Sequence, residues 1–242
     1  MAKMLKTYKG ELVEYEIYKL VDYYDPILRQ PTVPFKFESI EDNKRAHYIA
    51  FSLAETLAKL EGLGLSANQV GINERVCAIN MGSEIWTLFN PVITNHSLTP
   101  SVYQEGCLSY PGLYLNVDRW DSVTVKFQAI NGQFIEQEFS GLTAVCIQHE
   151  LDHLDGILYT SKVSPIKLEQ AKRKVKKNIK RMKLMSAQRA AAEAEAREQN
   201  KVVYEKQMLR PAKIAEEDLP QIKILEPGTN TGKATEKFVY NT

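Results

Sequence analysis

The spacing of apolar residues changes along the chain, and the first clear pattern is helical. Between Ser39 and Gly62 the apolar side chains recur every three or four residues, at Ile40, Ala46, Ile49, Ala50, Leu53, Leu57 and Leu60. This spacing predicts a long amphipathic helix. Ser39 or Asp42 is suited to cap its first turn, and Gly62 stands where a C-terminal cap is expected.

The following segment has the short apolar runs of β-strands. Strands are predicted at Val76–Ile79, Trp86–Phe89 and Val123–Phe127, with Gly-, Asn- and Pro-containing turns between them. Asn131-Gly132 separates Val123–Ile130 from Phe134–Phe139, which is a strong signal for an antiparallel hairpin.

A second helix is predicted after this hairpin. Ser140 is a plausible N-cap, Asp155-Gly156 ends the pattern, and the apolar positions are Leu142, Val145, Cys146 and Leu154. Helices on both sides of antiparallel strands indicate an α+β domain that ends near residue 163. We expect the strands to pack around this second helix, with the earlier helix as an addition in the N-terminal half.

The two ends of the chain lie outside this pattern. Residues 1–15 form a polar N-terminal extension, so the globular domain is expected over residues 16–163. Residues 164–199 predict a C-terminal helix that is first basic and then rich in Ala and Glu. Its basic part, Lys167–Lys183, holds nine Lys or Arg against the single Glu169. In residues 200–242 periodicity fades, and we expect a disordered tail.

Composition narrows the class of protein. The formal net charge of +1 gives no overall field that would attract nucleic acid. The three cysteines contain no C-x-x-C pair and are too scattered for a disulfide framework, which indicates a reducing cytoplasm. No apolar run reaches the length of a membrane span. We therefore expect a cytoplasmic protein that does not enter membranes.

The second predicted helix carries His149-Glu150-Leu151-Asp152-His153, an H-E-x-x-H motif. Positions four apart lie on one helix face, so both imidazoles can bind one metal ion. The neighbouring carboxylate can then move a proton to or from water on the metal. The motif is short, and a helix with two surface histidines and a solvated Glu is the alternative interpretation. A third ligand and an oxyanion donor are needed to decide.

Cys107 is the best candidate for the third ligand. It lies in Glu105-Gly106-Cys107-Leu108-Ser109, where a neighbouring glycine lets the backbone approach a metal and a substrate. Cys77 belongs to an apolar strand and is expected to be buried. Cys146 shares a helix face with the histidines, and we expect it to line a pocket. Asp152 is expected to be solvated or hydrogen-bonded to local backbone.

A second segment, Gly62-Leu63-Gly64-Leu65-Ser66-Ala67-Asn68-Gln69, offers an amide to an oxyanion. Taken alone it is weak, because a structural turn explains two glycines equally well and no third glycine completes a dinucleotide-binding pattern.

Together the three segments resemble the peptide deformylase family. Its signature is G-φ-G-φ-A-A-x-Q (φ, an apolar residue), then E-G-C-L-S, then Q-H-E-x-D-H, and this chain matches all three in order over roughly residues 16–163. Ser66 departs from the usual Ala, a change that we expect to leave Gln69 undisturbed.

The resemblance implies removal of the formyl group from the N-terminal formyl-methionine of newly made polypeptides. It implies that Cys107, His149 and His153 hold a divalent metal, with water in the fourth position. Glu150 would take the proton of that water and pass it to the departing amine. The Gln69 side chain and the Leu108 backbone N–H would stabilise the oxyanion.

The resemblance also assigns the surroundings of the site. Gly64 would bring its backbone up to the substrate, and Glu105 and Arg119 would pair to orient the cysteine loop. The methionine pocket would be lined by Leu63, Leu142, Val145, Cys146 and His149. The donor set itself suits zinc, whereas the resemblance favours Fe(II), with zinc, nickel or cobalt often found after purification.

Two other functions compete with this one. A zinc peptidase would use the same H-E-x-x-H with a downstream ligand such as Glu169, which leaves Cys107 unexplained. A ribosome-binding factor whose active site has decayed would not need intact metal ligands, and it would need neither Glu150 nor Gln69. The expected substrates are formyl-Met nascent peptides. The basic helix 167–183 also suggests a contact with ribosomal RNA. We expect a monomer, in the cytoplasm of a host if the source is viral.

Overall fold

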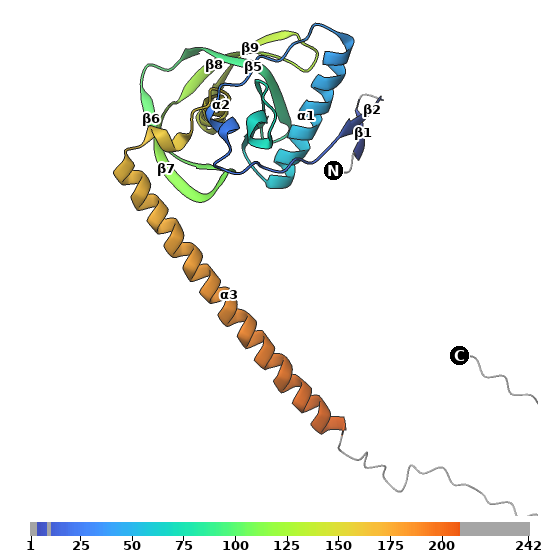
Figure 1. The fold of residues 1–242 in the computed structure, drawn as a ribbon, viewed down its shortest axis with the longest axis vertical. Helices are drawn as coiled ribbons and strands as arrows, with labels where there is room; N and C mark the ends of the chain where they lie inside the picture. The colour runs from blue at the N-terminus through green and yellow to red at the C-terminus, as the bar shows by residue number, and fades with distance from the viewer. Residues whose placement is uncertain (1–3, 9–10, 209–242) are drawn as a thin grey trace, which may run out of the picture. The chain divides into compact units, whose positions relative to one another are not determined.

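The computed structural model describes residues 4–8 and 11–208 (Figure 1). The chain divides into two compact units, Met1–Lys183 and Leu184–Thr242. Every residue of the candidate site lies in the first unit.

The first unit is built on a five-stranded antiparallel sheet in the order β3-β4-β5-β8-β9. Its strands are Gly64–Ser66 (β3), Val76–Asn80 (β4), Ile85–His96 (β5), Ser122–Gln128 (β8) and Phe134–Ser140 (β9). The predicted Asn131-Gly132 hairpin is confirmed, since β8 pairs with β9 from Ser122↔Ser140 to Gln128↔Phe134. The predicted α+β class with antiparallel strands is confirmed.

A separate hairpin, β6 (Pro100–Cys107) and β7 (Tyr110–Trp120), was not predicted. Its inward-facing positions explain why. In β6 the one buried residue is Glu105, and in β7 Leu113, Leu115 and Val117 are followed by buried Arg119. Charged residues on the inner face break the apolar alternation that marks a strand.

Helix α1 (Ile40–Leu60) is capped by Ser39, one of the two predicted candidates. Ser39 Oγ accepts from Asp42 N–H and Asp42 accepts from Ser39 N–H, which together form a capping box. Its C-terminal cap is Glu61, in the left-handed region at φ 52°, rather than Gly62. The buried face of α1 packs on β3, β4 and β5 through a cluster that includes Leu53, Leu57, Leu65, Ala78 and Phe89.

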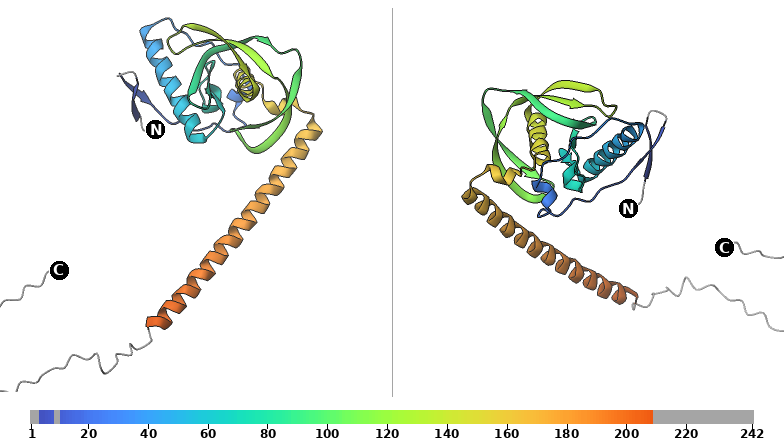
Figure 2. Two further views of the ribbon diagram at one scale, coloured as in Figure 1. Left: turned by 180° about the vertical axis from the view of Figure 1, so that it is seen from behind. Right: turned by 45° about the horizontal axis from the view of Figure 1, so that its top comes forward.

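Helix α2 (Gly141–Leu154) begins after Ser140, as predicted. Ala144, Ile147, Leu151 and Leu154 are buried against residues of β4, β8 and β9. Both views in Figure 2 show α2, in yellow, enclosed by the strands. Burial on nearly all sides means that any polar residue of α2 must find a partner inside the protein.

The remaining elements before α3 are short. The N-terminal extension holds a hairpin, β1 (Met4–Tyr8) with β2 (Glu11–Tyr15), which the sequence did not predict. Three short 3-10 helices are η1 (Pro26–Arg29), η2 (Ala67–Val70) and η3 (Tyr159–Lys162).

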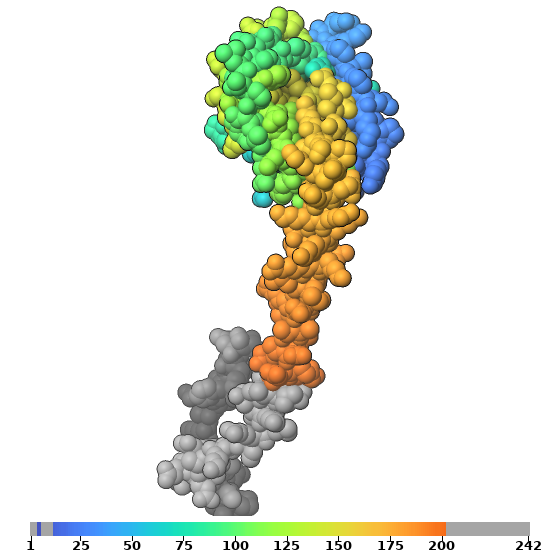
Figure 3. Space-filling model, turned by 90° about the vertical axis from the view of Figure 1, so that its left-hand side faces the viewer, coloured from blue at the N-terminus to red at the C-terminus, as the bar shows by residue number. Residues whose placement is uncertain are grey.

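Helix α3 runs from Pro165 to Met208, so residues 200–208 of the predicted disordered tail are helical instead. The rest of that tail, 209–242, lies outside the described residues. The start of α3 packs Leu168, Ala171 and Val175 against the inner face of β7 and Tyr159. The space-filling view in Figure 3 shows this gold segment seated beside the green strands. In the part of the chain that is described, no helix is long and apolar enough to cross a membrane.

Candidate metal-dependent active site

Three predicted ligands meet in the structure. Cys107 ends β6, while His149 and His153 lie one turn apart on α2, and their ligand atoms all lie within 4.8 Å of one another. Cys107 Sγ is 3.2 Å from His153 Nε2. Both histidines are buried, and Cys107 is half-buried. One sulfur and two imidazole nitrogens form a donor set for a divalent transition metal.

The charges around these donors fit a cation. Burial alone would lower the pKa of His149, but hydrogen bonds to Cys107 and Glu105 and nearby negative charge outweigh it and raise the pKa to about 10. Negative groups thus converge on this ring, and a bound metal ion would supply the positive charge that they favour. Burial lowers the pKa of His153 well below its usual value, so its ring is neutral and keeps a lone pair for a metal.

Glu105 orients the first histidine. Burial favours a raised pKa for Glu105, but hydrogen bonds from Arg119 and His149 prevail and lower the pKa to about 2. The group is therefore a carboxylate, and His149 Nδ1–H donates to Glu105 Oε2 over 3.0 Å. This bond leaves Nε2 of His149 free to face Cys107, the arrangement in which an outer carboxylate fixes a metal-binding imidazole.

Arg119 joins Glu105 to a residue whose role the sequence did not reveal. The predicted Glu105–Arg119 pair is present, with Arg119 Nη2 3.0 Å from Glu105 Oε2. Arg119 Nη1 also donates to Asp152 Oδ2 over 2.6 Å, and Lys162 Nζ lies 3.0 Å from Asp152 Oδ1. The expectation that Asp152 is solvated or bound to local backbone was wrong, because it is an internal ion-pair partner. No local signal in the sequence distinguished it from a solvated aspartate.

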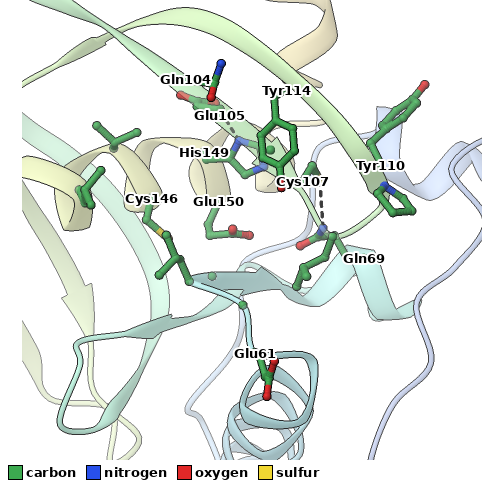
Figure 4. Close-up of a pocket in the computed structure, with 18 of the residues that line it drawn as sticks. Glu61, Gln69, Gln104, Glu105, Cys107, Tyr110, Tyr114, Cys146, His149 and Glu150 are labelled. Atoms are coloured by element: carbon green, nitrogen blue, oxygen red, sulfur yellow. Dashed lines mark hydrogen bonds and ion pairs between the residues drawn. The ribbon is translucent and has the colours of Figure 1, made fainter. Parts of the chain in front are cut away.

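Glu150 is buried beside the ligand cluster and lines the same cavity. Burial raises its pKa to about 7, although the charge of His149 and hydrogen bonds from Ser66 act in the opposite direction. A carboxyl group with a pKa near neutrality is suited to both accept and donate a proton. Figure 4 shows Glu150 pointing toward the space between Cys107 and Gln69.

Gln69 presents its amide nitrogen to the site. Gln69 Nε2 donates to Ser109 Oγ over 3.0 Å. It also lies 3.5 Å from Cys107 Sγ, a contact drawn as a dashed line in Figure 4. Its Oε1 is turned away and accepts from Ser66 N–H and Oγ–H. A buried side-chain N–H donor beside the cluster is what stabilisation of an oxyanion requires.

A cavity of about 470 Å³ opens onto these groups. It is lined by all of the residues predicted for the substrate: Leu63, Gly64, Gln69, Leu108, Leu142, Val145, Cys146, His149 and Glu150. Leu63 and Leu142 are more than half exposed, at 60% and 69%, so they flank the mouth rather than the interior. The sequence did not suggest that Tyr110 and Tyr114 also line the cavity, since they belong to the unpredicted β6–β7 hairpin.

Gly64 is confined by the catalytic groups. A Cβ atom at this position would lie 2.5 Å from Glu150 Oε1 and 2.7 Å from Cys146 Sγ. Only glycine therefore lets β3 pass this close to Glu150.

Glu169, the ligand that a zinc peptidase would have required, does not reach the cluster. It lies on α3, is exposed, and pairs with Lys172 at 3.3 Å. Cys107 takes the third position instead.

Known proteins are similar to this chain in sequence and fold. A family model described as "Polypeptide deformylase" matches residues 17–169. Peptide deformylase 1B, chloroplastic, of Oryza sativa subsp. japonica is 40% identical over 65% of this chain and 59% of its own length. Peptide deformylase 2 of Xanthomonas axonopodis pv. citri is 36% identical over 66% of this chain and 95% of its own length.

Solved structures agree. A peptide deformylase from Synechococcus elongatus, crystallised with actinonin, has a TM-score of 0.58 and 35% identity, covering 65% of this chain and 85% of that one. A peptide deformylase from Legionella pneumophila has a TM-score of 0.60 and 32% identity, covering 69% of this chain and 98% of that one. The match extends over the sheet, both helices and the site described above, and the chain belongs to the polypeptide deformylase family, hydrolases that remove the N-terminal formyl group of new polypeptides.

Proposed function

We propose that this protein hydrolyses the formyl amide of N-terminal formyl-methionine on nascent polypeptides, releasing formate. One observation carries the proposal: the ligand atoms of Cys107, His149 and His153 converge beside a cavity that Glu150 and Gln69 line. These are the parts that hydrolysis of an amide needs, namely a metal site, a proton carrier and an oxyanion donor.

Cys107, His149 and His153 would hold one divalent metal ion. When bound, such an ion lowers the pKa of water and polarises a carbonyl oxygen. The resemblance to the family favours Fe(II) as the physiological metal, and zinc, nickel and cobalt suit the same sulfur and nitrogen donors. Glu105 and Arg119 would keep the cluster in place. Glu105 fixes the ring of His149 by a hydrogen bond, and Arg119 donates a hydrogen bond to Glu105.

Glu150 moves the proton in this mechanism. Its carboxylate accepts a proton from the attacking water and delivers it to the nitrogen of the leaving amine. Glu150 does not bind the metal in this mechanism, because Cys107, His149 and His153 supply the three protein ligands.

Gln69 Nε2 and the backbone N–H of Leu108 stabilise the negative charge that develops on the formyl oxygen. The backbone of Gly64 runs along the substrate. Leu63, Val145, Cys146 and Leu142 receive the methionine side chain, whose flexible thioether suits an apolar pocket. The tight space around Gly64 and Glu150 favours a formyl group, which bears only hydrogen, over larger acyl groups.

The variant Glu150→Gln tests this assignment. Glutamine has the shape of glutamate without its proton affinity, so we expect a full equivalent of metal and a loss of kcat by several orders of magnitude on formyl-Met peptides. Metal analysis and formate release measure the two quantities. Wild-type kcat in this variant would contradict the assigned role of Glu150. A peptide without the formyl group serves as the control for peptidase activity.

We also propose that the basic segment Lys167–Lys183 of α3 binds ribosomal RNA. All nine of its Lys and Arg residues carry one sign, and such a run repels itself unless a polyanion is near. Binding to phosphates releases counterions, so co-sedimentation with ribosomes should weaken steeply between 50 and 200 mM salt, by roughly a thousandfold for six or more contacts. Salt-independent sedimentation, or none, would contradict this proposal.

The remaining expectations follow from the same assignment. Residues 16–163 form the catalytic domain, residues 1–15 an extension, and residues from 164 onward a segment for interactions outside the site. Since one chain supplies every group named above, a monomer suffices. The substrate implies a cytoplasm in which formylated chains are synthesised.

A further inference from the structure

Ser66 places a hydroxyl at a position where the family signature usually has alanine. It ends β3 and is fully buried. Ser66 Oγ lies 3.0 Å from Gln69 Oε1, and the Ser66 backbone N–H donates to the same oxygen over 2.9 Å. The hydroxyl therefore contacts Gln69 directly, which an alanine side chain could not do.

These two bonds decide which way the Gln69 amide faces. A carboxamide has an accepting end and a donating end that differ little in shape. With Oε1 held by two donors from Ser66, Nε2 must point the other way, toward Ser109 Oγ and Cys107 Sγ. A reversed amide would set its NH2 group against the Ser66 N–H and its oxygen against the Cys107 sulfur.

We propose that Ser66 is a positioning residue that fixes the Gln69 carboxamide with its N–H groups toward the reacting carbonyl. The inference rests on the proposed oxyanion role of Gln69. Ser66 does not line the cavity, so it acts through Gln69 and not on the substrate.

The backbone N–H alone cannot replace the hydroxyl. A carbonyl oxygen has two lone pairs, and in this buried place the hydroxyl satisfies the second one. Removing it leaves an unsatisfied acceptor and lets the amide swing about its remaining bond. A typical neutral hydrogen bond is worth about threefold to tenfold in an equilibrium, which sets the expected loss of kcat.

One competing acceptor lies near the same hydroxyl. Ser66 also contributes hydrogen bonds that act on Glu150. A hydroxyl has a single proton, so a double-mutant cycle with Gln69 shows which acceptor matters for turnover.

The test uses the full-length, metal-loaded protein and a formyl-Met peptide, with Ser66→Ala, Gln69→Ala and the double variant. We expect Ser66→Ala to lower kcat about threefold to tenfold with KM changed less than twofold. In the Gln69→Ala background the same substitution should have no effect on kcat. Ser66→Cys, which keeps a side chain of similar size but is a weak donor, should behave like Ser66→Ala.

Two measurements separate positioning from general stability. Ser52 is an equally buried serine whose Oγ accepts from Glu16 N–H over 3.0 Å, so Ser52→Ala should lower Tm and leave kcat unchanged. In 15N NMR spectra, the Gln69 side-chain NH2 signal should shift and its hydrogens exchange faster in Ser66→Ala, and neither should change in Ser52→Ala.

The inference is overturned if Ser66→Ala keeps wild-type kcat and an unchanged Gln69 NH2 signal. An equal loss in the Gln69→Ala background also overturns it, because the hydroxyl would then serve Glu150. If Gln69→Ala itself retains full activity, the proposed role of Gln69 fails first, and this result is distinct from the other two.

Discussion

At the scale of single residues, the metal ligands are supported by a chain of buried ion pairs. Glu105 contacts Arg119 and His149, and Arg119 contacts Asp152. His149, Glu150 and His153 were predictable from a short motif with helical spacing, and Cys107 from the glycine-containing segment Glu105–Ser109. The Asp152–Arg119 bond was not, since 33 residues separate the partners and nothing local in the sequence distinguishes a paired aspartate from a solvated one.

Gly64 offers a direct test of how tightly the catalytic groups are packed. In Gly64→Ala the new Cβ would overlap Glu150 Oε1 and Cys146 Sγ, so both side chains must move. We expect kcat/KM on formyl-Met peptides to fall about tenfold to a hundredfold, because small displacements of a catalytic group are costly.

Gly82→Ala is the matched control for this substitution. Gly82 has open space around it but a φ of +91°, so alanine strains the backbone of a turn that does not line the cavity. Its Tm should fall while kcat/KM stays the same. Unchanged kcat/KM in Gly64→Ala would show that Glu150 is not confined as described.

At the scale of elements, the sequence predicted those whose burial is purely apolar. Helix α1, helix α2 and the β8–β9 hairpin each carry a regular apolar pattern and a recognisable cap or turn. The β6–β7 hairpin was missed because its inner face includes Glu105 and Arg119, and because its prolines and glycines resemble turn signals. Thus the element that supplies Cys107 was hidden by the charged residues that support the site.

The N-terminal cap of α1 contributes to stability and not to catalysis. Ser39→Ala removes the acceptor for the Asp42 N–H, a bond of 3.1 Å, and should lower the free energy of unfolding by about 1 kcal/mol. Denaturant unfolding measures this loss, and kcat should remain at the wild-type value. Ser83→Ala, in the exposed turn after β4, is the control and should change neither quantity. A loss in Ser39→Ala no larger than in this control would mean that the capping box is not stabilising.

At the scale of the whole molecule, one unit contains the complete site and α3 carries a different kind of surface. The overall net charge of +1 conceals an acidic part, with 13 Lys or Arg against 20 Asp or Glu in residues 1–166, beside the basic run Lys167–Lys183. Catalysis and ribosome contact are therefore separable properties. Charge-reversing substitutions in that run should abolish salt-sensitive ribosome binding and leave the hydrolysis of free formyl-Met peptides unchanged.

The central claim is that a Cys-His-His site in this chain hydrolyses a formyl amide, and formate release tests it most directly. The full-length protein, purified without oxygen with its metal content determined, is mixed with formyl-Met, acetyl-Met and unblocked Met peptides of otherwise equal sequence. We predict about one equivalent of divalent metal, formate release from the formyl peptide alone, and loss of both metal and activity in Cys107→Ala. Cleavage of an internal peptide bond, or no formate from a protein with its metal bound, would contradict the account.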